Sequence, residues 1–507
     1  MGASFFHSSA NIGLNAKSIT VEVDISSGLP RFTIVGLPDA AISESRDRVR
    51  AAIKNSGFTF PRTRVTVNLA PADIKKQGPA YDFPIALALL AASGLLLNPN
   101  ALNDIIIIGE LALDGTVRPV DGVLLASLMA REENFKGIIV APENAEEAGL
   151  VNDVPVHPIK SLKELVDYIQ AGEALPVYTP KDIKAKERIE IDTMSSIKGQ
   201  EYTKRALEIA AAGGHNIIFS GPPGSGKTML ARAVPTILPE LTFNEALEIT
   251  KIHSVAGLTN QKRGMDLDRP FRSPHHSSSS VALIGGGTWP RPGEVSLAHR
   301  GVLFLDEFPE FPRGAIENLR QPLEDGIVTI SRAAGTLEFP AQFMLVAAMN
   351  PCPCGFLSDP TKACICTPNK VIQYQQKISG PLMDRIDIAV EVPKVEFEKL
   401  TSKEKGETSQ EIRKRVQKAR DIQIERYKNE SIQINTELTS KLLEKYCELN
   451  DECHALAKQA VERLNLSARA YTRVLKVART IADLSGAENL EVSHLTEALQ
   501  YRPRGRE

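Results

Sequence analysis

The chain has 507 residues, which is too long for a single hydrophobic core, and at roughly 150 residues per domain it predicts about three units. Its composition, with 42% apolar, 24% charged and 5% aromatic residues, is typical of a globular protein and excludes a disordered or fibrous one. The 60 Lys and Arg residues against 62 Asp and Glu residues give a net charge of −2, which excludes a protein that is basic throughout. Any contact with nucleic acid or a membrane must therefore be made by a local patch.

The sequence contains no segment that would carry the chain into or across a membrane. Its longest apolar stretch, 83–97, is about 15 residues long and falls short of the roughly 18 that suggest a crossing. The N-terminus has no basic segment followed by an apolar one, so no signal peptide is expected. Six cysteines are too few for a disulfide scaffold, and four of them lie between Cys352 and Cys366. We therefore expect a protein of the reducing cytoplasm with a candidate metal site.

The first part of the chain, residues 1–175, predicts a compact α/β unit. Three β-rich runs and two apolar helical segments support this prediction. The expected strands are Ile19–Ile25, Arg64–Leu69 and Ile105–Ile108, and the expected helices are Phe83–Leu97 and Val123–Glu132. A stretch rich in Lys, Glu and Pro follows at 176–190, and because it has no amphipathic periodicity it is the expected linker.

Two further units are expected after the linker. In 191–395 short apolar runs alternate with helical segments, which predicts a mostly parallel sheet covered by helices. This unit carries a cysteine-rich insertion at 351–367. Residues 396–507 are almost entirely helical in pattern and predict a helical lid. The expected fold class is α/β, with a helical domain at the C-terminal end.

The strongest motif is G-x-x-x-x-G-K-T, which stands directly after the apolar run 216–220 and directly before a helical segment. Glycines let backbone N–H groups turn inward around a β-phosphate, and the N-terminus of the helix adds its positive dipole. Lys227 would reach the β- and γ-phosphate oxygens, and Thr228 would place its hydroxyl on Mg²⁺. The motif predicts an ATP site formed by Gly221, Pro222, Pro223, Gly224, Ser225, Gly226, Lys227 and Thr228.

Two more apolar runs end in polar side chains that suit phosphoryl transfer. The first ends in Asp306, which would hold Mg²⁺, and Glu307, which would polarise the attacking water. The second, 343–349, ends in Asn350, which would orient that water near the γ-phosphate. Adjacent acids at the end of a strand can also be solvated caps, but after a P-loop the catalytic interpretation is favoured.

Three arginines follow these motifs and are candidates for contacts with nucleotide. Arg385, in the segment GPLMDRID, is a candidate finger that reaches the nucleotide of a neighbouring subunit, because phosphoryl transfer needs a cation where negative charge develops. Arg469 is a candidate lid sensor, with Arg473 as its alternative. An isolated arginine is more often a surface or ion-pair residue, and only the order of the motifs favours a functional role here.

In this order the motifs resemble those of AAA+ ATPases of the magnesium-chelatase/MCM branch. The linking segments FRSPHHS from Phe271, IGGG from Ile284, PRPGEVSLAHRG from Pro290 and LRQPLEDG from Leu319 strengthen the resemblance. With the first unit included, the chain resembles the ComM, or YifB-like, family along nearly its full length. The resemblance implies a homohexameric DNA helicase that acts on single-stranded or branched DNA. It would promote branch migration of recombination intermediates during natural transformation.

The first unit also resembles the Lon protease domain, an α/β unit with a Ser–Lys dyad. The similar segments begin VTVNLAPADIKKQGPAYD at Val65 and GELALDGTVRPVDGVLLA at Gly109. The resemblance puts Ala80 at the position of the nucleophile and Leu124 near that of the lysine base. Alanine has no hydroxyl and leucine has no amine, and Lys76 has no serine in its segment, so proteolysis is not expected. A scaffolding, ring-stabilising or DNA-contacting role remains.

The crowded cysteines form two C-x-C pairs around the loop 355–363. Four thiolates would complete a tetrahedral zinc site, and the ligands would be Cys352, Cys354, Cys364 and Cys366. The spacing is tighter than the usual C-x₂-C, so reduced surface cysteines and a redox disulfide remain as alternatives. The cluster stands between Asn350 and Arg385, so ordering it would position the finger against the neighbouring subunit. Cys447 and Cys453 are expected only to pack.

Two stretches are candidates for contact with DNA. Residues 260–300 carry six Lys and Arg against three acids, and the segment SPHHSSSS offers hydroxyls and imidazoles. Residues 327–339 predict a β-hairpin, which in the resembling family projects into the pore of a hexamer. Copies around a ring would bind phosphates without sequence preference. The candidate residues are Arg263, Arg272, His275, His276 and Arg332. A solvated hairpin is the alternative for the second stretch, and a metal pair at the two histidines lacks a third ligand.

The motifs favour a ring-forming, ATP-driven DNA translocase that binds Mg²⁺·ATP between subunits. The main alternative is a chelatase-type ATPase that remodels a protein partner, in which case DNA would have no effect. An ATP-dependent protease is disfavoured by Ala80 and Leu124. A purely structural nucleotide-binding module is disfavoured by the pairing of Glu307 with Arg385.

Overall fold

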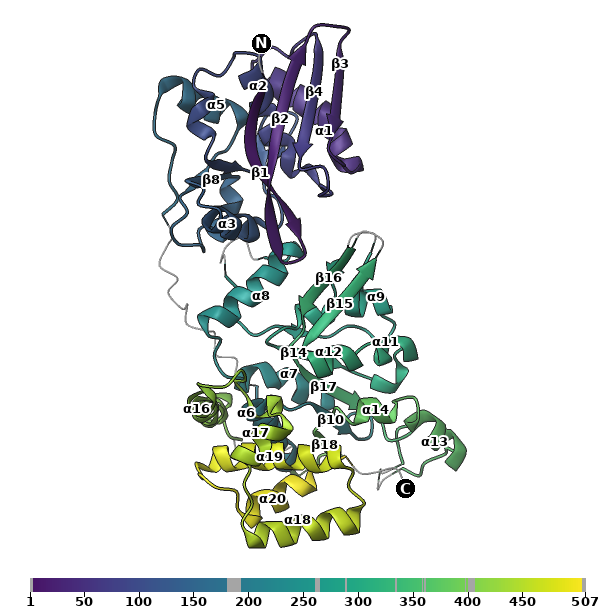
Figure 1. Ribbon diagram of the computed structural model, residues 1–507. Helices are drawn as coiled ribbons and strands as arrows, with labels where there is room; N and C mark the ends of the chain where they lie inside the picture. The colour runs from purple at the N-terminus through teal and green to yellow at the C-terminus, as the bar shows by residue number, and fades with distance from the viewer. Residues whose placement is uncertain are drawn as a thin grey trace. The chain divides into compact units, whose positions relative to one another are not determined.

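The chain forms two compact units (Figure 1), which we call the head unit and the P-loop unit. The head unit comprises Met1–Lys186 and Ala246–Leu267, and the P-loop unit comprises Glu187–Glu245 and Asp268–Glu507. A computed structural model describes residues 3–179, 193–259, 265–287, 290–332, 335–357, 359, 362–396, 398–399 and 406–503, with the backbone alone at Ala40, Arg332 and Gly335. From residue 180 on, the expected linker 176–190 lies outside the described residues.

A seven-stranded mixed sheet forms the frame of the head unit, in the order β3-β4-β2-β1-β5-β8-β9. Its strands are β1 (Ser4–Ile12), β2 (Asn15–Ser26), β3 (Arg31–Val35), β4 (Arg64–Ala70), β5 (Ile105–Ile107), β8 (Gly137–Val140) and β9 (Val156–Pro158), and a separate hairpin joins β6 (Glu110–Leu111) to β7 (Val117–Arg118). The expected strands Ile19–Ile25 and Arg64–Leu69 lie within β2 and β4, and the expected strand Ile105–Ile108 extends one residue beyond β5. Strand β1, SFFHSSANI, carries too many polar residues to be predicted and pairs along its whole length with β2.

Helices cover both faces of this sheet. The helices are α1 (Ala40–Asn55), α2 (Asp82–Ala92), α3 (Val123–Glu132), α4 (Ala145–Ala148) and α5 (Leu162–Ala171). Successive residues of β5 point to opposite faces, so Ile107 joins the core of α1, α2 and α5 and Ile106 joins the core of α3 and α4. Helix α3 matches its expected bounds, whereas α2 ends at Ala92 because Ser93 caps it and Gly94 takes a φ of 72°.

A segment from the middle of the sequence belongs to the head unit. Residues Ala246–Leu267 include most of helix α8 (Phe243–Val255), which packs on the apolar cluster around α3. The hydroxyl of Ser254 donates to the carboxylate of Glu147 at 2.5 Å, and the backbone N–H of Leu124 donates to the same oxygen at 3.0 Å. Burial raises the pKa of Glu147, against the opposing effect of these donors.

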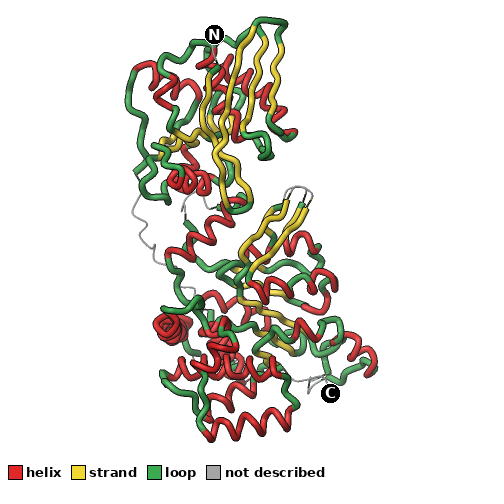
Figure 2. The backbone as a smooth tube through the Cα atoms, in the orientation of Figure 1, coloured by secondary structure: helices red, strands yellow, loops and turns green. Residues whose placement is uncertain are grey.

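The P-loop unit is built on a five-stranded sheet in the order β11-β14-β17-β10-β18, and every pair is parallel. The strands are β10 (Ile217–Ser220), β11 (Phe271–Arg272), β14 (Val302–Leu305), β17 (Met344–Met349) and β18 (Ile388–Glu391). Helices separate these strands in sequence, so the expected parallel sheet covered by helices is confirmed. Figure 2 shows the strands and helices in different colours. These helices are α6 (Glu201–Gly213), α7 (Lys227–Ile237), α9 (Ser280–Ile284), α10 (Glu294–Leu297), α11 (Arg313–Glu317), α12 (Arg320–Asp325), α13 (Pro368–Gln375) and α14 (Gly380–Met383).

The predicted hairpin after residue 326 is present. Strands β15 (Ile327–Arg332) and β16 (Gly335–Pro340) pair antiparallel, with Ile327 opposite Pro340 and Arg332 opposite Gly335. Arg332 is therefore the last paired residue before the turn, and residues 333 and 334 lie outside the described residues. A second, shorter hairpin joins β12 (Gly285–Gly286) to β13 (Arg291–Pro292).

The C-terminal part is helical, as expected. It comprises α16 (Ser409–Tyr427), α17 (Ser440–Tyr446), α18 (Asp451–Leu464), α19 (Ala468–Ser485) and α20 (Val492–Gln500). The apolar residues of α16 and α19 form one continuous core with those of α6, α7 and the sheet, and Cys447 and Cys453 are buried in it. In the part of the chain that the structure describes, no helix is both long and apolar enough to span a membrane.

Candidate active site

The P-loop connects β10 to α7 at the carboxyl end of the sheet. Two of its glycines, Gly224 and Gly226, take φ values of 75° and 91°, which residues other than glycine rarely adopt. At Gly221 a Cβ atom would lie 2.2 Å from the backbone oxygen of Val392, so no other residue fits beside β18 without moving that strand. These glycines let the loop curl tightly ahead of the helix, as a phosphate cradle requires.

Lys227 lies inside this loop. Its ammonium donates to the backbone oxygens of Gly221 at 2.7 Å and Pro222 at 2.9 Å, and to the side-chain oxygen of Asn350 at 3.3 Å. Burial lowers the pKa of Lys227, and the nearby carboxylate of Asp306 opposes that shift. The lysine is therefore positioned by carbonyl oxygens that phosphate oxygens would replace when a nucleotide binds.

The two predicted magnesium ligands are in contact. The hydroxyl of Thr228 donates to Oδ2 of Asp306 at 2.8 Å, which places two oxygen donors side by side next to the P-loop. Oxygen donors of this kind are what Mg²⁺ prefers, and the metal usually keeps several waters beside them. Thr228 and Asp306 fit such an ion and would hold it next to the P-loop.

Glu307 follows Asp306 with a left-handed backbone, at a φ of 52°. Its side chain is 54% exposed, and its Oε2 atom lies 3.0 Å from Nδ1 of His276. Its backbone N–H donates to Oδ1 of Asp306 at 2.9 Å. Non-glycine residues with positive φ are uncommon and often occur where the backbone must aim a functional side chain.

The predicted residues meet because parallel strands share their carboxyl ends. The P-loop follows β10, Asp306 follows β14 and Asn350 follows β17, and these three strands are neighbours in the sheet. The structure thus brings together Lys227, Thr228, Asp306 and Asn350 in direct contacts. The crevice outside the carboxyl ends of such strands is where α/β proteins bind ligands.

Arg385 lies at the opposite edge of this sheet. It precedes β18, and its backbone oxygen accepts a bond of 2.9 Å from the side chain of Asn216, the residue before β10. Because β10 and β18 are parallel and the P-loop follows β10, the length of a four-residue strand, about 13 Å, separates Arg385 from the P-loop of its own chain. Its guanidinium pairs with Glu324.

The other two candidate arginines lie near Arg385. Arg473 donates to the backbone oxygen of Met383 at 3.1 Å and pairs with Asp384 at 3.5 Å. Burial and the positive charges of Arg320 and Arg469 lower the pKa of Arg385. Arg385 and Arg473 line one cavity of about 540 Å³, and the Nε atom of each is buried without an acceptor among the described residues. These arginines therefore lie together on one side of the P-loop unit, away from the P-loop of the same chain.

The four crowded cysteines come together. Sulfur atoms of Cys352, Cys354 and Cys364 lie 3.4 to 3.6 Å apart, and all four ligand atoms, with Cys366, lie within 4.8 Å of one another. A tetrahedral site with Zn–S bonds of about 2.3 Å requires sulfur separations of about 3.8 Å, which this cluster meets. Backbone N–H groups of Phe356 and Ile365 lower the pKa of Cys354 to about 6, whereas burial and the neighbouring Cys354 raise the pKa of Cys364 to about 12.

The cysteine cluster also adjoins the P-loop. Gly355, the residue after the first C-x-C pair, has a φ of 83°, and a Cβ atom there would lie 2.6 Å from Cδ of Pro223. The side-chain amide of Gln375 on α13 donates to the backbone oxygen of Pro351 at 3.1 Å. Sequence spacing suggested a link only to Arg385, whereas the contact that the structure shows is with the nucleotide loop.

The candidate residues for DNA contact have different surroundings. Arg272 forms a two-point pair with Glu294, at 2.7 and 2.8 Å, so its guanidinium is engaged within the chain. His275 stacks on His276 with ring centroids 4.1 Å apart, and His276 lies next to Glu307. Arg263 and the side chain of Arg332 lie outside what the structure describes. The contact of His276 with Glu307 was not expected from the sequence.

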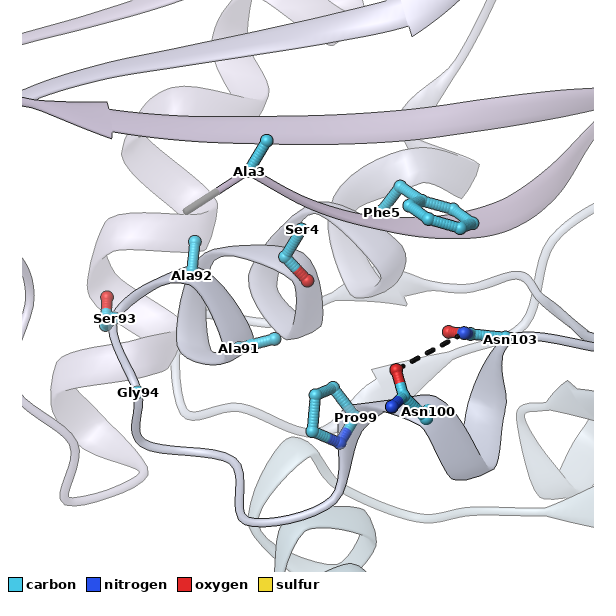
Figure 3. A pocket seen from close by; sticks show the side chains of 10 residues that line it. All are labelled: Ala3, Ser4, Phe5, Ala91, Ala92, Ser93, Gly94, Pro99, Asn100 and Asn103. Carbon is cyan, nitrogen blue, oxygen red and sulfur yellow. Dashed lines mark hydrogen bonds between the residues drawn. The ribbon is translucent and has the colours of Figure 1, made fainter. Parts of the chain in front are cut away.

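The head unit shows no dyad at the Lon-like positions, since Ala80 and Leu124 occupy them. Lys76 is fully buried, and its ammonium bonds to the backbone oxygen of Pro71. A cavity of about 420 Å³ in this unit is lined by apolar, hydroxyl and amide side chains such as Phe5, Ser4 and Asn100 (Figure 3), with no acid or base among them. The cavity has no group suited to acid–base catalysis.

Comparison with known proteins agrees with these motifs. Family models match in three segments: 21–144 matches "Subunit ChlI of Mg-chelatase", 193–400 matches "Magnesium chelatase, subunit ChlI", and 406–502 matches its C-terminal part. The chain is 44% identical to competence protein ComM of Haemophilus influenzae, over 99% of this chain and 98% of that protein. The chain belongs to the ComM/YifB family.

Further members of the ComM/YifB family are similarly close. YifB of Escherichia coli is 44% identical over 99% of this chain and 97% of its own length. An uncharacterized protein of Mycobacterium tuberculosis is 40% identical over 97% of both chains. The family match and the P-loop geometry together identify an AAA+ core of the magnesium-chelatase type, a class that binds ATP and Mg²⁺.

Proposed function

We propose that this protein is a ring-forming, ATP-dependent DNA helicase that promotes branch migration of recombination intermediates during natural transformation. The observation that carries the proposal is the separation of the two halves of the catalytic site. Lys227 and Arg385 stand at opposite edges of one parallel sheet, so a site that uses both residues would need two subunits. Membership of the ComM/YifB family, with a relative named as a competence protein, supports the role in transformation.

Within one subunit, the P-loop would hold the phosphates and Lys227 would neutralise their β- and γ-oxygens. Thr228 and Asp306 would hold Mg²⁺, which withdraws charge from the transferred phosphoryl group when it is bound. Glu307 would take a proton from the attacking water, and Asn350, which already contacts Lys227, would orient that water. Each role follows from a side chain at the carboxyl edge of the sheet.

The neighbouring subunit would complete this site with Arg385. A cation placed where negative charge develops accelerates phosphoryl transfer. Arg473 and Arg469 accompany Arg385 on the same side of the unit, so they would approach the same neighbouring nucleotide. Heterologous contacts of this kind close into a ring when the rotation permits, and we propose a homohexamer in the cytoplasm.

DNA would be held by the hairpin β15–β16 and by the segment that includes His275. Around a ring, Arg332 at the end of each hairpin would contact phosphates and follow a single strand without reading its sequence. Arg263 would add to this patch. Arg272, because it is paired with Glu294, would shape the segment more than contact DNA directly.

We further propose that Cys352, Cys354, Cys364 and Cys366 hold one structural zinc ion. Their sulfur separations and their closed arrangement suit a Cys₄ site with no open coordination position. Such an ion would fold the segment 351–367 against the P-loop, where Gly355 lies next to Pro223.

A second candidate function is a chelatase-type ATPase that remodels a protein partner. The matches to magnesium-chelatase subunit models in all three segments favour it. The two functions differ in their response to DNA, because a protein remodeller would hydrolyse ATP at the same rate with or without it.

The deciding experiment measures ATP hydrolysis without DNA, with single-stranded DNA and with a four-way junction, together with junction unwinding. Helicase function predicts faster hydrolysis with DNA and ATP-dependent resolution of the junction, both absent in Lys227→Ala. Hydrolysis that ignores DNA and an unresolved junction would exclude the helicase and favour the remodeller.

A further inference from the structure

The segment between β11 and α9, residues 273–279, is held at both of its ends. At the first end, Arg272 pairs with Glu294 through two N···O contacts of 2.7 and 2.8 Å. At the second, the side chain of Ser279 accepts a bond of 3.2 Å from the backbone N–H of Ala282 and caps α9. Strand β11 adds a third constraint because it pairs with β14. The ends of this segment are thus tied to β14, the strand that ends at Leu305, two residues before Glu307.

The register between the two strands explains which side chains meet. Arg272 is the partner of Leu303 in the parallel pair β11–β14. His276 and Glu307 each lie four residues after those partners, beyond the carboxyl ends of β11 and β14. Their side chains meet there, with Nδ1 of His276 at 3.0 Å from Oε2 of Glu307.

From these contacts we infer that His276 is a positioning residue for Glu307, an inference that rests on the proposed hydrolysis of ATP by this site. The carboxylate of Glu307 is more than half exposed. Apart from the backbone bond to Asp306, His276 is the partner found for it among the described residues. A carboxylate has two oxygens, and holding Oε2 against the imidazole directs Oε1 toward the water it must activate.

His276 also connects the hydrolytic site to the candidate DNA segment. Its ring stacks on that of His275, and His275 bonds at 2.8 Å to Ser277 in the exposed part of the same loop. A phosphate bound to the imidazole of His275 would therefore lie one stacked ring away from the group that orients Glu307.

The test compares His276→Ala with the conservative His276→Asn in the full-length protein. The amide nitrogen of asparagine lies close to where Nδ1 of histidine lies, so it retains a donor for Glu307. Loss of orientation predicts that kcat for ATP falls about tenfold in His276→Ala with KM nearly unchanged, and that His276→Asn recovers most of it. A residue that merely supports the fold would instead change thermal stability or KM, and asparagine would not rescue it.

His454→Ala, which removes an exposed histidine on α18, is the matched control and should behave as wild type. A wild-type kcat in His276→Ala, or a rise in KM in place of a fall in kcat, would overturn the inference. The same assay with DNA separates this result from the proposed function. If wild type hydrolyses ATP but ignores DNA, the helicase proposal fails, while the kcat ratio of the variants still decides the role of His276.

Discussion

The side-chain amide of Asn216 donates to the backbone oxygen of Arg385 at 2.9 Å, and this bond fixes Arg385 at the amino edge of the sheet whose carboxyl edge carries Lys227. Arg385→Ala and Lys227→Ala should each abolish hydrolysis, for different reasons. By the proposed function, the first would remove the cation that acts on the nucleotide of a neighbouring subunit, and the second would remove a phosphate ligand from the nucleotide site of its own subunit.

Mixing the two inactive variants should therefore restore part of the activity. In a mixed ring some interfaces combine the intact Lys227 of one subunit with the intact Arg385 of the next. Steady-state hydrolysis is measured after subunit exchange, with each variant incubated alone as the control. Continued inactivity in mixtures proven to contain both variants would show that Arg385 does not act between subunits.

We expect that substitution of two cysteines of the cluster removes zinc and weakens nucleotide binding together. Cys352→Ser with Cys354→Ser should lower the zinc content from about one ion per chain to none, because two ligands cannot hold the site. It should also weaken ATP binding, since Gly355 would no longer be held beside Pro223. Metal analysis and nucleotide titration measure both effects.

Cys447→Ala provides the comparison for that experiment, because Cys447 is buried in the apolar core away from the cluster. Its zinc content should equal that of wild type. Retention of zinc in the double serine variant would contradict the metal assignment, and unchanged ATP affinity after zinc loss would contradict the coupling to the P-loop.

Burial of Glu147 predicts a pH-dependent stability of the head unit. Because the pKa of this group is raised in the folded protein, the contribution it makes to stability is fully present below its ordinary value of 4.5. That contribution is lost as the pH rises through the folded pKa. Glu147→Gln, which keeps an acceptor for Leu124 and Ser254, should therefore raise the Tm at pH 8 and have little effect at pH 4.

The alanine variant separates charge from hydrogen bonding at the same position. Glu147→Ala leaves two buried donors without an acceptor and should cost about 1–3 kcal/mol of unfolding free energy at pH 4, and less at pH 8, where the wild type has lost the contribution of the protonated group. Thermal unfolding across this pH range measures both variants. A Glu147→Gln protein that loses stability at pH 8 would show that the carboxylate charge is required.

We expect that substitution of Arg332 in the hairpin β15–β16 decreases DNA affinity in a salt-dependent way. Arg332→Ala should weaken binding to single-stranded DNA of any sequence, and it should reduce the slope of log K against log salt by about 1 for each phosphate that is no longer neutralised. Fluorescence anisotropy at several salt concentrations measures the slope. Arg463→Ala on the exposed face of α18 is the control, and an equal effect of both variants would assign the decrease to net charge alone.

Much of the nucleotide site was predictable because its residues stand where apolar runs end. Asp306 and Asn350 follow strands whose hydrophobicity is unbroken, and the carboxyl ends of these strands lie side by side because the strands are parallel neighbours. The contact of His276 with Glu307 was not predictable. It depends on the register of β11, a two-residue strand with the sequence Phe-Arg, which carries no periodic pattern.

The head unit likewise contains elements that could be predicted from the sequence and one that could not. Strands β2 and β4 and helix α3 have clear patterns, and their predicted positions agree with the structure. The attachment of residues 246–267 to this unit could not be read from the sequence. Helix α8 has the composition of any half-buried helix, and only its packing on the core around α3 shows which unit it joins.

That packing has a consequence for how the two units separate. Because residues 246–267 are continuous with the P-loop unit in sequence yet belong to the head unit, the chain passes between the units at 245–246 and 267–268 as well as at 186–187. A protease that cuts between 176 and 190 would produce two fragments on a denaturing gel. Under native conditions the two fragments should elute together in size-exclusion chromatography. The hydrogen bond from Ser254 to Glu147 and the apolar contacts of α8 would hold them together.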